Sequence, residues 1–256
     1  MRWVALCCLF SGLVAYLAAT AQADNAATAA DSYKKAAEAD VKFLQTRLAE
    51  LAQKQAAGEN LLQGHIKPAL GVALLLAAYG QAMGDNTLRG EALKIIDAIQ
   101  AKKFADANTL AKNLAVKPGQ PGKLDALPKP LPPDAMLEAV MNPYRLTKVG
   151  GLNIEKDIRD MIKGNNPLKI EPAAVEVLAV RTAVLSAYAS HYPNPEAQKT
   201  PADKKQWEKW SLEAMELSQQ LAAEATKGST ADTMKMKKLL TEINNTCNHC
   251  HEKYRD

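Results

Sequence analysis

The residues with the clearest capacity for chemistry stand near the C-terminus, in the run Cys247-Asn248-His249-Cys250-His251. This run has the spacing C-x-x-C-H, which is the attachment signature of c-type haem. Two thiols three residues apart lie on one helix face, where they can add to the two vinyl groups of haem, and the histidine that follows can ligate the iron. We therefore predict one covalently attached haem c, held by Cys247 and Cys250, with His251 as the iron ligand.

Three other chemistries use closely spaced cysteines, and each fits this chain less well. A structural zinc site needs four ligands, whereas the only other cysteines, Cys7 and Cys8, lie in a segment that we expect to be removed. A thioredoxin-like redox pair would stand at a helix N-terminus after a strand, but this pair ends the last helix of a chain without strand patterns. A structural disulfide would strain the helix and would leave His251 without a role.

The last helix has to position these groups, and its apolar residues recur at spacings of 4, 3, 4, 3 and 4. The members of this stripe are Met236, Leu240, Ile243, Cys247, Cys250 and Tyr254. Such a stripe faces the interior of a helical bundle, so a flat apolar cofactor attached there would enter the core. Tyr254 continues the stripe, and we expect it to pack on the porphyrin. Ser229 and Asp232 have the spacing of a capping box at the start of this helix.

Helical periodicity extends through both halves of the chain, and the composition agrees with an all-α fold. Hydrophobic residues make up 47% of the chain but aromatic residues only 5%. The first half is expected to hold helices at about 26–57, 68–84, 88–102 and 104–115, with Pro68 as a first helical residue and Gly84 as a terminator. The second half is expected to hold a helix from Asp134, disturbed at Pro143 and broken at Gly150-Gly151, then helices over 154–163 and 172–190, one around Trp207 and Leu221, and the last.

A proline-dense segment separates these halves. Six of the thirteen prolines lie within 117–133, and proline stiffens a chain and forbids interior helix positions. We therefore expect an N-terminal helical domain at 24–116, a linker at 117–133 and a haem domain at 134–256. The alternative is one larger bundle with a long surface crossover. The first half carries no haem motif, so we expect a haem-less helical bundle there.

The N-terminus has the three parts of a secretory signal peptide. Met1-Arg2 supplies a positive start, residues 3–19 an uncharged apolar run, and Ala21-Gln22-Ala23 a small-residue cleavage site. We expect residues 1–23 to be cleaved and the mature protein to be exported to the periplasm. An integral membrane protein is not expected, because the longest later apolar run, 66–83, contains a lysine, a proline, two glycines and a glutamine.

The charge pattern argues against nucleic acid as a partner. The chain has 32 basic and 28 acidic residues, for a formal charge of +4, and lysine and glutamate are interspersed along it. A nucleic-acid footprint would gather the basic residues in a patch or stripe.

The C-terminal half resembles a known family. A C-x-x-C-H near the end of the last helix of a four-helix bundle, followed by an aromatic and a basic residue, here Tyr254-Arg255, resembles the class II c-type cytochromes, the cytochrome c′ family. The helix with Trp207 and Trp210 and the stretch 240–250 are also similar to that family. The resemblance covers about 134–256.

This resemblance implies a four-helix bundle with haem at its C-terminal helix. It also implies thioether anchors at Cys247 and Cys250, with His251 as the fifth iron ligand. Members of the family are periplasmic haem proteins that transfer electrons or bind nitric oxide and carbon monoxide at an open distal face. The leading hypothesis is therefore an exported mono-haem electron-transfer cytochrome with a redox partner protein. The alternative is binding or sensing of a diatomic gas.

Other function classes have less support in the residues. No paired carboxylates, nucleophile triad or second metal constellation accompanies the haem motif, so an enzyme is not expected. A third hypothesis is a structural or partner-binding helical protein, in which the first half performs the recognition. A homodimer is also considered.

Residues outside the motif offer further contacts with the haem. Arg181 is the only charged residue between Glu176 and His191 and falls on an apolar face, so we predict that it meets a haem propionate; the alternative is a snorkelling side chain. Met136 and Met141 stand where a relative would supply a thioether ligand, although core filling is the simpler role. Met141 precedes Pro143 by two residues, so we expect its helix to bend where a sixth iron ligand would need rigid support. We therefore predict a five-coordinate, largely high-spin haem. Its open face would be covered by apolar side chains, namely Leu137, Val140 or Met141.

Overall fold

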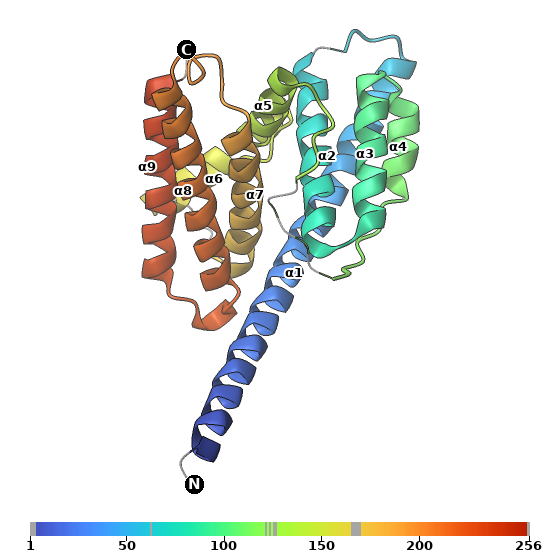
Figure 1. Ribbon diagram of the computed structural model, residues 1–256. Coiled ribbons are helices and arrows are strands. Elements are labelled where there is room, and N and C mark those ends of the chain that lie inside the picture. The colour runs from blue at the N-terminus through green and yellow to red at the C-terminus, as the bar shows by residue number, and fades with distance from the viewer. Residues whose placement is uncertain are drawn as a thin grey trace.

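The computed structural model describes residues 4–61, 63–120, 122, 124, 127–164 and 170–254, with side chains from residue 29 onward except that of Gln63. These residues form α-helices and short 3-10 turns, and no strand (Figure 1). The elements in chain order are α1 (Val4–Ala56), α2 (Gln63–Met83), α3 (Asn86–Gln100), α4 (Phe104–Lys112), α5 (Pro133–Met141), η2 (Asn142–Tyr144), η3 (Thr147–Val149), α6 (Ile154–Lys163), α7 (Pro172–His191), α8 (Pro201–Ala225), η4 (Gly228–Thr230) and α9 (Thr233–Tyr254).

The helices form two groups. Figure 1 shows α1–α4 on one side and α6–α9 on the other, with α5 between them at one end. The first helix buries apolar residues spaced alternately four and three apart, namely Ala37, Val41, Leu44, Leu48 and Leu51. The helix itself is longer than expected, because α1 begins at Val4 and includes the backbone of most of the expected signal peptide. Residues 1–3 and the side chains up to residue 28 lie outside the description.

Three expected helix ends differ in the structure. Pro68 lies inside α2, which begins at Gln63, and α5 begins at Pro133, with Pro132 in place of Asp134 as its N-cap. At the start of α9, Asp232 caps the helix alone: its carboxylate accepts hydrogen bonds from the backbone N–H groups of residues 234 and 235, at 2.9 and 3.1 Å. Ser229 cannot take that position because it lies in η4.

One hydrophobic core runs through both groups of helices. The same cluster of buried side chains contains Leu75 and Ile95 from the first group and Val184 and Leu240 from the second. Helices α1 and α2 both contact α7, and α2 also contacts α5. The two groups of helices therefore share a core. Whether 24–116 and 134–256 fold independently stays a prediction.

Two ion pairs, each with a buried carboxylate, also cross between the groups. Arg181 of α7 binds Asp40 of α1, with 2.6 Å between Nη2 and Oδ1. Asp40 is fully buried and also accepts a hydrogen bond from the hydroxyl of Tyr79, at 3.1 Å. Glu176 of α7 accepts hydrogen bonds from Lys35 and from Ser32 of α1. Buried carboxylates need such partners because water is not available to solvate them.

The described part of the segment 117–133 packs on the protein. The backbone N–H of Lys117 donates to the carboxylate of Asp85 at 2.6 Å, and that of Gly119 donates to the carbonyl of Met83 at 2.9 Å. Leu127 and Leu131 are buried in the shared core. Residues 121, 123, 125 and 126 of this segment lie outside the description.

Two helices are long and apolar enough to cross a membrane by length and composition alone. They are α2, over Gly64–Met83, and α7, over Pro172–His191. This corrects the expectation that no apolar stretch after the N-terminal one is long enough to span a membrane. Inside the bundle these windows are 83% and 72% buried. Core helices of this kind pass the same test, so the finding is weak support for a membrane span.

Candidate haem site

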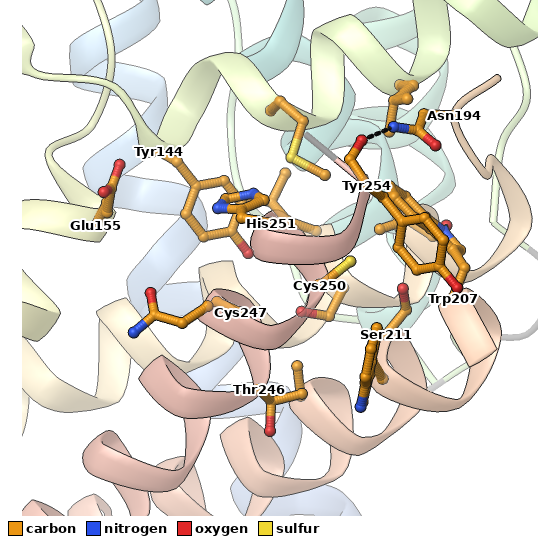
Figure 2. A pocket seen from close by; sticks show the side chains of 18 of the residues that line it. Tyr144, Glu155, Asn194, Trp207, Ser211, Thr246, Cys247, Cys250, His251 and Tyr254 are labelled. Carbon is orange, nitrogen blue, oxygen red and sulfur yellow. Dashed lines mark hydrogen bonds between the residues drawn. The ribbon is translucent and has the colours of Figure 1, made fainter. Parts of the chain in front are cut away.

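The thiols and the histidine of the C-x-x-C-H motif line one cavity of about 520 Å³. Its walls come from α5 with η2, from α6, α7, α8 and α9, and from Asn194 in the loop between α7 and α8. Small-molecule and cofactor sites fall in this size range, and they combine an apolar lining with a few polar groups. Figure 2 shows Cys250 between His251 and Tyr144 on one side of the view and Trp207 and Tyr254 on the other.

Helix α9 presents both thiols to this cavity, as the spacing of the motif predicts. Cys247 and Cys250 are free thiols of intermediate exposure. Burial, with a smaller contribution from the charge of Glu155, raises the pKa of Cys247 to about 11. Burial also raises the pKa of Cys250 to about 12, with a smaller contribution from Cys247. Both thiols are therefore protonated at neutral pH.

His251 follows the thiols on the exposed end of α9 and lines the same cavity. Tyr144 of η2 also lines it. Burial raises the pKa of Tyr144, and a hydrogen bond with Ser186 of α7 opposes that shift in part. Sequence reasoning did not single out Tyr144, because it lies in a 3-10 turn after Pro143, where helical periodicity gives no signal.

Tyr254 lines the cavity and also fastens the end of α9. Its ring is buried against Trp207, with 5.8 Å between the ring centroids. Its hydroxyl donates to the backbone carbonyl of Asp203 at 3.1 Å and lies 3.2 Å from the carboxylate of the same residue. The amide of Asn194 donates to the carbonyl of Tyr254. Arg255, the basic residue that follows, lies outside the described residues.

The indole of Trp207 is fixed as well. Its Nε1–H donates to the carbonyl of Ala189, at 2.6 Å, so the ring joins the start of α8 to the end of α7. Trp210 stands one turn later and meets the ring of Tyr254 edge-on at 5.9 Å. These rings give one side of the cavity an aromatic lining that suits a flat apolar ligand.

The residues of α5 expected near the haem, as cover of its open face or as a thioether ligand, divide into two sets. Leu137 and Met141 line the cavity. Met136 and Val140 are fully buried on another face of α5 and are not part of the lining. The division follows from helical geometry, because residues four apart share a face. Of the two methionines, only Met141 is near the expected haem position.

Arg181 is not brought to the cavity. Its guanidinium binds Asp40 of α1 through Nε and Nη2, and it does not line the site. The expected contact with a haem propionate is therefore replaced by an internal ion pair. The sequence could not indicate this, because the countercharge lies 141 residues away. Arg145, which is exposed at the end of η2, is an arginine that does line the cavity.

The residues present fit a covalently held haem. The cavity combines two neutral thiols, an imidazole on the next residue, and apolar walls from Leu137, Ile158 and Leu185. A zinc site has no comparable support, because no group of three or more His, Cys, Asp or Glu side chains within the described part of the chain could hold a metal ion.

Comparison with known proteins agrees with this geometry. No curated protein and no solved structure matches the chain. The family model described as Cytochrome C' matches residues 152–255, which span α6 to α9 and hold both thiols and His251. Residues 152–255 are therefore similar to the cytochrome c′ family, whose members are four-helix bundles that bind haem c.

Proposed function

We propose that the chain is an exported cytochrome that carries one haem c, attached through Cys247 and Cys250 and ligated by His251. The observation that supports this most is the meeting of both thiols and the imidazole in one apolar cavity at the end of α9. When bound, the haem supplies a one-electron Fe(III)/Fe(II) couple and an axial position for a small ligand. The leading function is electron transfer to a redox partner protein, and we do not expect an enzyme.

The protein's own residues hold and shield the group. Cys247 and Cys250 provide the two attachment points on one face of α9. Trp207 and Tyr254 provide an aromatic wall that excludes water, and their hydrogen bonds to backbone carbonyls keep the rings in place. Arg145 provides positive charge near the site, where it can offset the charge of the propionates.

A second function, binding or sensing of nitric oxide or carbon monoxide, is favoured by the apolar side chains of α5. Leu137 and Met141 line the cavity, and both imidazoles outside the motif, His65 and His191, are absent from its lining. An apolar covering admits small neutral gases and disfavours anions. We therefore expect a five-coordinate, largely high-spin ferric haem. Electron paramagnetic resonance should show the same high-spin signal in Met141→Leu as in the parent protein; a low-spin signal lost in that variant would identify Met141 as a sixth ligand.

Attachment is tested by denaturing mass spectrometry of protein matured in a compartment that ligates haem. We expect one haem per chain, and a mature N-terminus near residue 24. Cys247→Ser and Cys250→Ser should each keep a single thioether, and the double variant should release its haem into acidified solvent. Asn245→Ser is the matched control, because Asn245 is exposed on the same helix and does not line the cavity. A bare polypeptide mass would exclude the cytochrome.

A further inference from the structure

The wall of the cavity formed by α5 and η2 lies outside the region that the family model matches. That region begins at residue 152, whereas α5 and η2 cover 133–144. This wall contributes Leu137, Met141 and Tyr144 to the cavity. On its other side, it packs against α2 of the N-terminal group. The wall therefore stands between the first group of helices and the candidate haem site.

Gly71 of α2 is a point of close approach between α2 and this wall. A Cβ atom at this position would lie 2.4 Å from the carbonyl oxygen of Ala139 and 2.8 Å from Cδ of Pro143. Both neighbours are rigid, since one is helix backbone and the other a proline ring. Only glycine lets α2 and the α5–η2 wall approach this closely.

Two further contacts join α2 to this wall and to the turn that follows it. Lys67 forms an ion pair with Glu138, which itself lines the cavity. Pro68 packs on the turn at Gly150, where a Cβ atom would lie 2.9 Å from the proline ring. The far end of the wall is joined to the segment just before α6, because the N–H of Leu152 donates to the carbonyl of Pro143 at 2.8 Å. A movement at Gly71 would therefore be carried along the whole wall.

We infer that the N-terminal helices position this wall, with Gly71 as the positioning residue, and thereby set how readily a small ligand enters the haem cavity. The inference rests on the proposed function, because it assigns the first group of helices a role at that same site. A side chain at position 71 would push the wall away from α2 and toward the cavity. The Ala139 carbonyl would have to move by about 1 Å to reach ordinary contact distance.

The test uses full-length mature protein and carbon monoxide as the probe. Gly71→Ala should slow carbon monoxide association with the reduced protein by roughly threefold or more, which is the size of effect that packing changes have on coupled sites. Hydrogen exchange of the backbone amides in 137–145 should be faster, while exchange in α9 should be unchanged. The matched control is Gly64→Ala, because Gly64 is on the same helix and a Cβ atom there meets nothing within 4 Å.

A second variant covers the case in which Gly71→Ala does not fold. Lys67→Met removes the ion pair to Glu138 without adding bulk near the wall, and it should speed both amide exchange in 137–145 and carbon monoxide association by about twofold or more. Lys94→Met, which breaks the exposed pair of Lys94 with Glu91 on α3, is its control.

The two readouts separate this inference from the proposed function. If the chain carries no haem, the proposed function fails, and the amide exchange of 137–145 still reports whether α2 positions the wall. If haem is present and both Gly71→Ala and Lys67→Met behave like their controls in association rate and in exchange, the positioning role is wrong.

Discussion

The buried pair between Arg181 and Asp40 offers the sharpest test of how the two groups of helices are held together. Asp40 is fully buried in α1, and its carboxylate meets Arg181 of α7 at 2.6 Å. Replacing Arg181 by methionine keeps an unbranched apolar stem of similar length and removes the positive charge. The carboxylate is then left in the core with a single described donor, the hydroxyl of Tyr79.

The expected loss of unfolding free energy is about 3–5 kcal/mol at pH 7, the range found when one partner of a buried pair is removed. The loss should depend on pH. Burial already raises the pKa of Asp40 above its ordinary value of 3.8, and Arg181 opposes that shift. Without the guanidinium the folded-state pKa rises further. Protonation of Asp40 therefore stabilises the folded variant fully below pH 3.8, and this stabilisation is lost as pH rises through the raised folded-state pKa. The loss of unfolding free energy caused by Arg181→Met should accordingly shrink in acid.

The assay is denaturant unfolding followed by circular dichroism, at pH 7 and in steps down to pH 4. Arg159→Met is the control, because Arg159 pairs with Glu155 on the exposed face of α6 and such pairs contribute about 1 kcal/mol or less. The variant Asp40→Leu with Arg181→Met and Tyr79→Phe should recover most of the loss, since an apolar replacement of the whole group leaves no buried charge. A cost at pH 7 equal to that of Arg159→Met, or one that does not fall with pH, would refute this reasoning.

Two more predictions concern the C-terminal helices. The N–H of Asp232 and the ammonium groups of Lys227 and Lys235 lower the pKa of Glu224 to about 2. Glu224→Gln should therefore be less stable than the parent protein at pH 7, and the difference should shrink as pH falls below 4.5 toward the folded value. A difference in unfolding free energy that stays the same at every pH would contradict this. In haem-free folded protein, the rate at which iodoacetamide alkylates Cys247 and Cys250 should rise with pH, with midpoints of about 11 and about 12. Peptide mass spectrometry measures this rate. Midpoints near the ordinary value of 9 would show that the thiols are not buried.

The candidate site was predictable where its signal is local in the sequence. The thiols and His251 lie within five residues, and their spacing alone fixes which face of α9 they share. Tyr254 was identified for the same reason, since it continues the stripe that Cys247 and Cys250 occupy. Of the three residues expected to cover the open face of the haem, Leu137 and Met141 line the cavity, whereas Val140 is buried elsewhere.

The rest of the site depends on contacts between distant segments. Tyr144 and Asn194 lie in irregular backbone, where no periodicity marks a buried face. Arg181 falls on an apolar face of α7, as the sequence indicates, but periodicity identifies only that a face is buried and not what covers it. The partner is Asp40 of α1, and nothing near Arg181 in the sequence points to it.

The same gap between local and distant signals explains why the proline-dense segment was interpreted as a domain boundary. Closely spaced prolines predict a segment without α-helix. The structure agrees, because no α-helix lies between Lys112 and Pro133 in the part of the chain that it describes. Prolines do not report whether the flanking helices share a core. A fragment that begins at 134 would expose the faces of Met136 and Val140 that are buried in the intact chain, and it would leave Glu176 and Arg181 without their partners from α1. The N-terminal helices therefore contribute side chains to the same core as the C-terminal helices.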